Sequence, residues 1–385
     1  MTKVYITGEF LKNKSYLPVL FPNFGELKNE KRLFADLGNR AFKRQVFDIV
    51  TDINEADFIL LPHDFFDVIT TDKNYLQRHI DLAHQHHKKL LIFDLSDYTE
   101  REIDVPEAWV FRIAGYRSQM KNNVIIMPNF VEDLSQYGKI FWRNKSKRPI
   151  IGFCGWANLS TIKQKLKLFI KNLLIDLQSA VARDTSLEAH KQGIYFRMQA
   201  IKALRECRDI SVNFIIRNSY SSHANTIELL AEEARRQYID NILKSDLSLA
   251  VRGDANISCR FYEILSLGRV PLFVDTDCVL PMENVVDYKK FIFHIDYKDL
   301  SNIGKVVADF YGGLSDEDFV QMQKSAREAF TKYLNPVSFL EYILPVLANK
   351  NVRACNSQYD LICPENDFIS SSSDNIKEKF FNEKS

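Results

Sequence analysis

The chain alternates short, nearly continuous apolar runs with longer segments whose apolar residues recur at helical spacing. Continuous apolar runs between helices are typical of parallel strands that are buried on both faces. We therefore expect an α/β protein with helix-covered parallel sheets. The predicted strands are 4–7, 46–50, 57–61, 90–93, 110–113, 124–127, 149–154, 212–216, 247–251 and 270–274, and the predicted helices are 29–37, 75–88, 162–182, 226–243, 316–333 and 336–347.

A basic segment at 139–148 divides this pattern into two parts of similar design. We predict a first Rossmann-like lobe at 1–140, a linker at 141–148 and a second Rossmann-like lobe at 149–335. A terminal helix at 336–349 is expected to return to the first lobe. The polar tail at 350–385 contains a serine run and is expected to be weakly ordered. A second interpretation of the basic segment, which includes Phe141 and Trp142, is contact with an anionic membrane surface.

The predicted helix at 162–182 has a clear apolar period, with Lys163, Lys167 and Lys171 on its outer side. We interpret these lysines as a solvated face. The apolar positions are Ile162, Leu166, Phe169, Ile170, Leu173, Leu174 and Leu177.

Composition narrows the class of protein. The 385 residues carry a formal net charge of +1, so no overall field favours nucleic acid. The six cysteines form no C-x-x-C pair, which favours free thiols in a reducing compartment over a disulfide framework. The N-terminal residues lack the pattern of a signal peptide, and no run is long enough to span a membrane. We expect a cytoplasmic protein, with peripheral contact at the inner face of a membrane as a further option.

The most informative polar residues follow the strand predicted at 247–251. Arg252 and Gly253 lie in a loop, Ser258 can cap the next helix, and Arg260 and Glu263 share a face of that helix. An arginine near a helix start adds positive charge to an end that is already positive, which favours binding of an anion there. Two guanidinium groups and free backbone amides suit a diphosphate. The alternative is that Arg260 and Glu263 pair with each other on a solvated face.

This stretch resembles the exostosin-type glycosyltransferases of family 47, over roughly residues 240 to 300. It differs from the common family pattern at Val251, where proline is usual, and at Arg269 and Val270, where Cys-Ile is frequent. The matching motifs are Arg252-Gly253, Ser258-x-Arg260-x-x-Glu263, Gly268-x-x-Pro271 and Asp277-x-x-Leu280-Pro281.

The resemblance implies a GT-B fold, in which two Rossmann-like lobes face each other across a cleft. It implies an inverting glycosyltransferase, hexosyl or pentosyl, that moves a sugar from a nucleotide-sugar, taken as UDP-linked, to a glycan or lipid-linked acceptor in polysaccharide synthesis. The alternative is a non-catalytic nucleotide-sugar-binding subunit of a polysaccharide-synthesis complex. A dehydrogenase is disfavoured because no G-x-G-x-x-G follows either first strand. The expected donor-binding residues are Arg252, Gly253, Ser258, Arg260, Glu263, Arg217 and Gly155.

An inverting transfer needs a base that deprotonates the acceptor hydroxyl. His63 and Asp64 follow a predicted strand on a loop that would face the second lobe, and Glu9 lies at an equivalent strand end. These three residues are the catalytic candidates, and Asp94 and Asp97 are rivals from neighbouring strand ends.

We expect no cofactor and no metal site. Asp275-Thr276-Asp277 resembles a D-x-D metal motif, but in a GT-B fold arginines and helix dipoles usually neutralise the leaving diphosphate. The histidines His84, His86 and His87 are interpreted as a solvated helix end.

Overall fold

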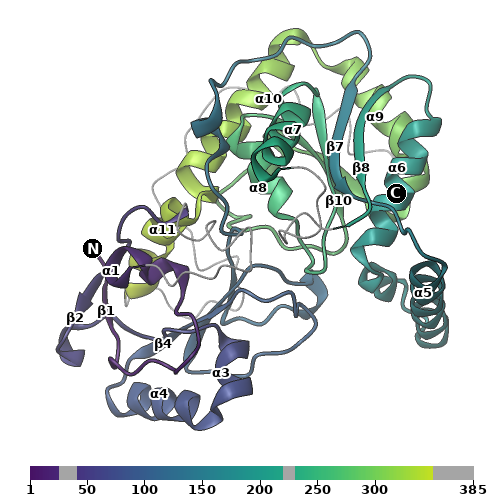
Figure 1. Ribbon diagram of the computed structural model, residues 1–385. Coiled ribbons are helices and arrows are strands. Elements are labelled where there is room, and N and C mark those ends of the chain that lie inside the picture. The colour runs from purple at the N-terminus through teal and green to yellow at the C-terminus, as the bar shows by residue number, and fades with distance from the viewer. Residues whose placement is uncertain (26–40, 220–229, 350–385) are drawn as a thin grey trace.

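The computed structural model describes residues 1–25, 41–219 and 230–349. The helix predicted at 29–37, the start of the helix predicted at 226–243 and the polar tail lie outside these residues. Two parallel sheets, one in each half of the chain, organise the described part (Figure 1). This arrangement confirms the predicted α/β class and the two-lobed GT-B architecture.

The first lobe contains a six-stranded sheet in the order β2-β1-β3-β4-β5-β6, with every pair parallel. Helices α3 and α4 pack on one face, where buried side chains such as Ile59, Ile92 and Val110 meet Phe65 and Tyr75. The strands are β1 (Lys3–Tyr5), β2 (Asp48–Val50), β3 (Phe58–Leu60), β4 (Lys89–Asp94), β5 (Ala108–Arg112) and β6 (Val124–Ile126), and the helices are α1 (Phe21–Phe24), α3 (Phe65–Thr71) and α4 (Lys73–Gln85).

The second lobe contains a five-stranded parallel sheet in the order β11-β10-β9-β7-β8. Helices α6 and α9 pack on one face of this sheet, and α7 and α8 pack on the other. The strands are β7 (Ile150–Trp156), β8 (Ser211–Arg217), β9 (Leu247–Ala250), β10 (Val270–Asp275) and β11 (Phe293–Asp296), and the helices are α5 (Ile162–Ala182), α6 (Gly193–Glu206), α7 (Ala231–Leu243), α8 (Cys259–Ser266), α9 (Ile303–Gly313) and α10 (Asp316–Ala329).

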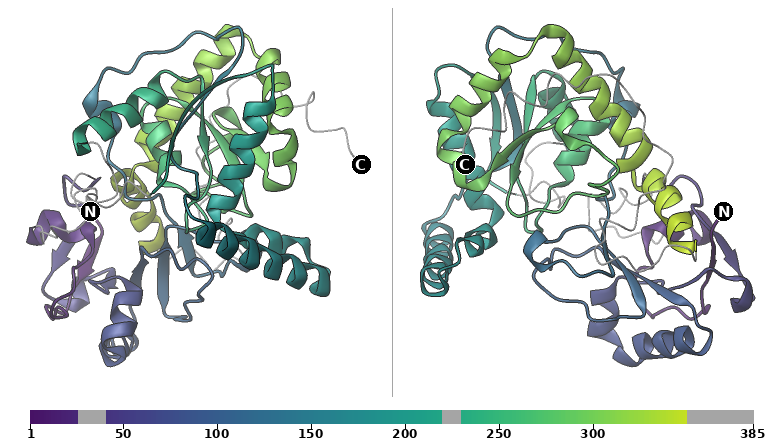
Figure 2. Two further views of the ribbon diagram at one scale, coloured as in Figure 1. Left: turned by 45° about the vertical axis from the view of Figure 1, so that its right-hand side comes forward. Right: turned by 180° about the vertical axis from the view of Figure 1, so that it is seen from behind.

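Helix α11 (Pro336–Ala348) leaves the second lobe and packs on the first (Figures 1 and 2). Its Phe339 meets Phe111 of β5 edge to face, with ring centroids 6.4 Å apart, and its Glu341 forms a 2.7 Å ion pair with Arg44. Buried residues of α11, α8 and the first sheet form one continuous core. The two lobes therefore share apolar packing.

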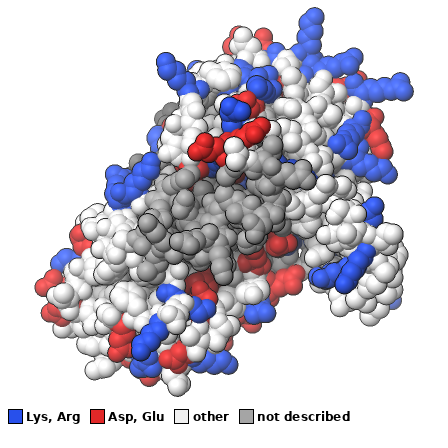
Figure 3. Space-filling model, viewed as in Figure 1, with Lys and Arg blue, Asp and Glu red and all other residues white. Residues whose placement is uncertain are grey.

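Three properties of the structure bear on the sequence-based expectations. Lysine and arginine are interspersed with aspartate and glutamate on the visible face, in keeping with the net charge of +1 (Figure 3). Among the described residues, no helix is both long enough and apolar enough to cross a bilayer. The cysteines Cys154, Cys207, Cys259 and Cys278 are free thiols.

Candidate functional site

The loop after β9 connects the carboxyl edges of the two sheets. Arg252 is 6% exposed, and its Nη1 donates to the Tyr116 hydroxyl (2.6 Å) and to the Ala189 carbonyl (3.0 Å). Its Nη2 donates to the carbonyl of Asp254 at 2.9 Å. Since both terminal nitrogens are engaged by protein, these contacts favour Arg252 as a residue that holds the loop against the first lobe.

The same loop is fixed by Asn256, whose N–H donates to the Thr99 hydroxyl at 3.1 Å and whose amide donates to the Gly115 carbonyl at 3.2 Å. Gly193, at the start of α6, packs directly on the loop backbone. A Cβ at this glycine would lie 2.2 Å from the carbonyl oxygen of Gly253. Gly253 therefore lies in a tightly packed turn between α6 and the first lobe.

Arg260 extends from the first turn of α8 to the carboxyl end of β7. Its Nη2 donates to the Cys154 carbonyl at 2.7 Å, and its guanidinium lies 4.2 Å from the centroid of the Phe153 ring. Its Nε and Nη1 are buried and have no hydrogen-bond partner among the described residues. Gly155 permits this approach, because a Cβ there would lie 2.6 Å from Nη2 of Arg260. Two donor nitrogens of Arg260 are thus suited to an anionic ligand.

Arg217 ends β8 next to this position, since its strand register pairs it with Trp156 of β7. Burial raises the pKa of the Cys154 thiol, and the nearby guanidinium groups of Arg217 and Arg260 oppose that rise. Gly155, Arg217 and Arg260 therefore gather at one sheet edge.

Glu263 lies one turn further along α8 and is buried. Its Oε1 accepts from Arg235 at 2.9 Å, and its Oε2 accepts from the Tyr238 hydroxyl at 2.5 Å. Arg235 also pairs with Glu132, so it joins the two carboxylates. The alternative of a solvated Arg260–Glu263 pair is wrong, because Glu263 faces α7.

Ser258 occupies the N-cap position of α8, but its side chain makes no capping hydrogen bond. Ser258 is partly exposed at the helix start. The residues that sequence reasoning missed are Tyr116, Glu132, Gly193, Arg235, Tyr238 and Asn256, which carry no local motif.

Asp64 caps α3 in the first lobe. Its Oδ1 accepts from the N–H groups of Phe66 (2.9 Å) and Asp67 (3.3 Å), and its Oδ2 accepts from Leu95 (2.7 Å). Burial raises the pKa of Asp64 to about 6 despite these bonds. A carboxylate with this pKa can act as a base near neutral pH.

His63 and Glu9 have different environments. His63 is fully buried, its Nε2 accepts from the Leu11 N–H and its Nδ1 lies 2.9 Å from the Ser15 carbonyl, and burial lowers its pKa. These contacts favour a structural role. Glu9 is exposed, 3.8 Å from Arg78.

The rival carboxylates also differ. Asp94 is buried and forms a 2.8 Å ion pair with Arg112. The carboxylate of Asp97 accepts from the N–H of Ala255 in the second lobe. Burial, and then the neighbouring Asp254, raise its pKa. Asp97 therefore lies where the two lobes meet.

Both aspartates of the D-x-D motif, Asp275 and Asp277, accept hydrogen bonds from other groups of the protein. Asp275 accepts from the Cys278 N–H at 2.7 Å and lies 2.9 Å from Nε2 of His294. Asp277 has a φ of 62° and accepts from the Ser118 hydroxyl at 2.6 Å, which links the lobes. Within 1–25, 41–219 and 230–349, no group of three His, Cys, Asp or Glu side chains is arranged to hold a metal.

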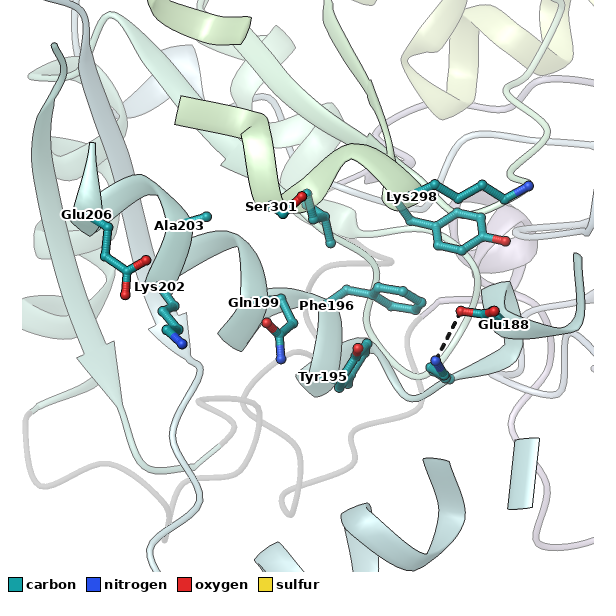
Figure 4. Close-up of a pocket in the computed structure, with 12 residues that line it drawn as sticks. Glu188, Tyr195, Phe196, Gln199, Lys202, Ala203, Glu206, Lys298 and Ser301 are labelled. Carbon is teal, nitrogen blue, oxygen red and sulfur yellow. Dashed lines mark hydrogen bonds and ion pairs between the residues drawn. The ribbon is translucent and has the colours of Figure 1, made fainter. Parts of the chain in front are cut away.

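A separate cavity of ≈ 420 Å³ lies between α6 and the 3₁₀ segments Thr185–His190 and Tyr297–Asn302 (Figure 4). Its lining includes Tyr195, Gln199 and Lys298. None of the predicted donor or catalytic residues lines it, so it is distinct from the candidate site.

Residues 181–310 match the family model described as the Exostosin GT47 domain. The matched segment includes the loop after β9, the whole of α8 and Arg217. No curated protein matches the chain. The family assignment suggested by the sequence motifs is confirmed for this segment: residues 181–310 match an exostosin-type domain of glycosyltransferase family 47.

Proposed function

Starting from the exostosin-type glycosyltransferase domain, we propose that this protein moves a sugar from a nucleotide-sugar to a hydroxyl of a glycan or lipid-linked acceptor, with inversion at the anomeric carbon. The proposal rests mainly on Nε and Nη1 of Arg260 at the carboxyl edge of the second sheet, which are buried and have no hydrogen-bond partner in the part of the chain that the structure describes. Open α/β sheets bind ligands at this edge.

The donor diphosphate lies at the start of α8, with Arg260 and Arg217 on its oxygens and the Ser258 hydroxyl beside it. As the glycosidic bond breaks, the electron pair passes to the leaving diphosphate oxygen and negative charge grows there. Fixed guanidinium groups stabilise that charge more strongly than they stabilise the ground state. Glu263 retains acceptor capacity beyond its two bonds, and it accepts from the ribose hydroxyls.

A carboxylate of the first lobe takes the proton of the acceptor hydroxyl while that oxygen attacks the anomeric carbon opposite the leaving group. Asp64 is favoured by its raised pKa, and Asp97 by its place between the lobes. Glu9 and His63 are the remaining candidates, and the contacts of His63 favour its role in supporting the turn.

The donor is proposed to be UDP-linked, and the transferred sugar a hexose or pentose used in polysaccharide synthesis. Arg260 and Arg217 supply positive charge at the diphosphate, so we propose that no divalent metal is required. The setting is proposed to be the cytoplasm, with peripheral contact at the inner face of the membrane.

The test is a screen of nucleotide-sugars against the purified protein. Thermal shift should identify the donor that stabilises the chain, because a ligand that binds the native state raises its stability. Incubation of that donor with oligosaccharide or lipid-linked acceptors should give transfer, and NMR of the product should show the inverted anomer. Binding without hydrolysis or transfer would favour the non-catalytic subunit, and a retained anomer would contradict the in-line step.

A further inference from the structure

Helix α5 projects from the second lobe and lies away from both sheets (Figures 1 and 2). A capping box formed by Thr161 and Gln164 starts the helix. Its buried side chains are Leu168, Asn172 and Ser179, which recur on one side of the helix. The helix therefore contacts the protein along one narrow strip.

The other side of α5 carries a row of large apolar side chains that are open to solvent. Their exposed fractions run from 44% at Leu173 to 85% at Ile162 and Val181. At 3.6 residues per turn, this row lies on roughly the opposite side of the helix from Leu168 and Ser179. The apolar stripe comprises Ile162, Leu166, Phe169, Ile170, Leu173, Leu174, Leu177 and Val181.

Four exposed lysines flank the apolar stripe. Lys163, Lys167 and Lys171 follow one edge and Lys165 lies at the other, whereas Asp176 is the one acidic residue within α5. Three of these lysines lie in the first two turns, where the helix dipole disfavours positive charge. Figure 3 shows basic side chains in blue beside uncharged surface on this projecting element.

We infer that α5 lies in the headgroup region of a bilayer that contains anionic lipids, with the apolar stripe toward the acyl chains. Helices that bind membrane interfaces combine a wide apolar face with lysines at its borders, and anionic headgroups attract those lysines. Lysine stems can cover apolar surface while their ammonium groups reach the headgroups.

The charge pattern decides between a membrane and a second helix. A helix pair buries a narrower seam and usually places charges of both signs beside it. The apolar stripe is wider than such a seam. Four lysines and one aspartate flank it, and that aspartate, Asp176, forms a 2.6 Å ion pair with Lys191, so the net flanking charge is positive. Lys163, Lys167 and Lys171 are exposed, as expected for a solvated face. In this inference that face lies against the lipid headgroups, and the membrane contact falls on α5 rather than on 139–148.

The experiment is co-sedimentation of the full chain with vesicles of phosphatidylcholine, with and without phosphatidylglycerol. Wild type should bind the anionic vesicles, and the double variant Phe169→Glu with Leu173→Glu should bind at least about tenfold more weakly. The control, Val212→Glu with Val306→Glu, changes side chains of similar exposure, 42% and 40%, elsewhere and should bind as wild type does.

Two further measurements locate the contact. Each of Lys163→Gln, Lys167→Gln and Lys171→Gln should weaken binding to anionic vesicles about fivefold, the equivalent of about 1 kcal/mol. Phe169→Trp should show a blue shift of tryptophan emission when vesicles are added, relative to the wild-type chain with its three native tryptophans.

Several outcomes would overturn the inference. Wild type could fail to bind anionic vesicles, or the stripe variant could bind as well as wild type. A third is that the stripe variant dissociates a dimer in sedimentation equilibrium while no form binds vesicles, which would assign the face to a protein partner. Circular dichroism of each variant establishes that α5 remains folded.

Discussion

Arg260 is the residue on which binding of the donor should depend most. Arg260→Ala removes, at the end of β7, two donor nitrogens that have no partner within residues 1–25, 41–219 and 230–349. Hydrogen bonds to charged groups contribute about 1.5–3 kcal/mol each, so loss of two should weaken binding of the nucleoside diphosphate by about 10² to 10⁴. Isothermal calorimetry with UDP and other nucleoside diphosphates measures this directly.

The control for Arg260 is Arg236→Ala, which removes an exposed guanidinium from α7 and should leave the affinity unchanged. Arg260→Lys keeps the charge but loses the planar fork, and should recover only part of the affinity. Equal affinity in Arg260→Ala and wild type, with both folded, would remove Arg260 from the donor site.

The catalytic base should be visible in the pH dependence of the rate. Because burial raises the pKa of Asp64 to about 6, its carboxylate is ionised above that pH and protonated below it. If Asp64 is the base, kcat/KM is constant above pH 6 and falls about tenfold per pH unit below it.

Asparagine is a good N-cap, so Asp64→Asn should fold, while its kcat falls by about 10² to 10⁴ and its nucleotide affinity is kept. The same substitution at the rival carboxylate, Asp97→Asn, is compared with it. Loss of activity in Asp97→Asn alone would transfer the role to Asp97, and full activity in both would exclude both carboxylates.

At this scale, sequence reasoning could predict residues that belong to a local motif. Arg260 and Glu263 were predicted from their spacing, and Gly155 and Arg217 from their positions at strand ends. It could not predict that the guanidinium of Arg252 would donate a hydrogen bond to the Tyr116 hydroxyl. Nor could it predict that Arg235 would form ion pairs with both Glu263 and Glu132. These partners come from distant parts of the chain, and their charges resemble those of any solvated helix.

Among the elements, α6 should control the loop that connects the lobes. Gly193→Ala would place a Cβ 2.2 Å from the carbonyl oxygen of Gly253 and 2.5 Å from that of Arg252. Backbone atoms cannot yield as a flexible side chain can, so overpacking should lower the free energy of unfolding by about 1–3 kcal/mol. Urea unfolding measures the change, and nucleotide affinity should fall with it.

A matched helical glycine is available in α9. A Cβ at Gly312 meets nothing within 4 Å, so Gly312→Ala should raise stability by up to about 1 kcal/mol. A neutral Gly193→Ala would mean that the loop can move away from α6 without cost.

The elements also show where periodicity stops being informative. The apolar period predicted α5 at the residues where it occurs, 162–182, because helical spacing depends on the local sequence. The same period does not say what the apolar side faces, and in the structure that side faces away from the protein. Helix α6 was not predicted, and its role depends on contacts with a loop about 60 residues later.

For the whole molecule, the alternation of strands and helices was sufficient to predict two parallel sheets, since short apolar strands between helices leave few other arrangements. It did not predict that one continuous core would run through both lobes. That core depends on α11 crossing to the first sheet, where Phe339 meets Phe111.

The shared core has a consequence for unfolding. Because buried residues of both lobes contact α8 and α11, wild type should unfold in one cooperative transition, with equal calorimetric and van't Hoff enthalpies. Phe339→Ala removes a buried side chain from this junction and should cost about 3–5 kcal/mol. It should also make the lobes unfold in two separate transitions, because the packing that couples them is weakened.

The control is Phe319→Ala, at a fully buried site within the second lobe. It should destabilise the protein by a similar amount yet keep one transition. Two transitions in wild type, or one in Phe339→Ala, would show that α11 does not couple the lobes.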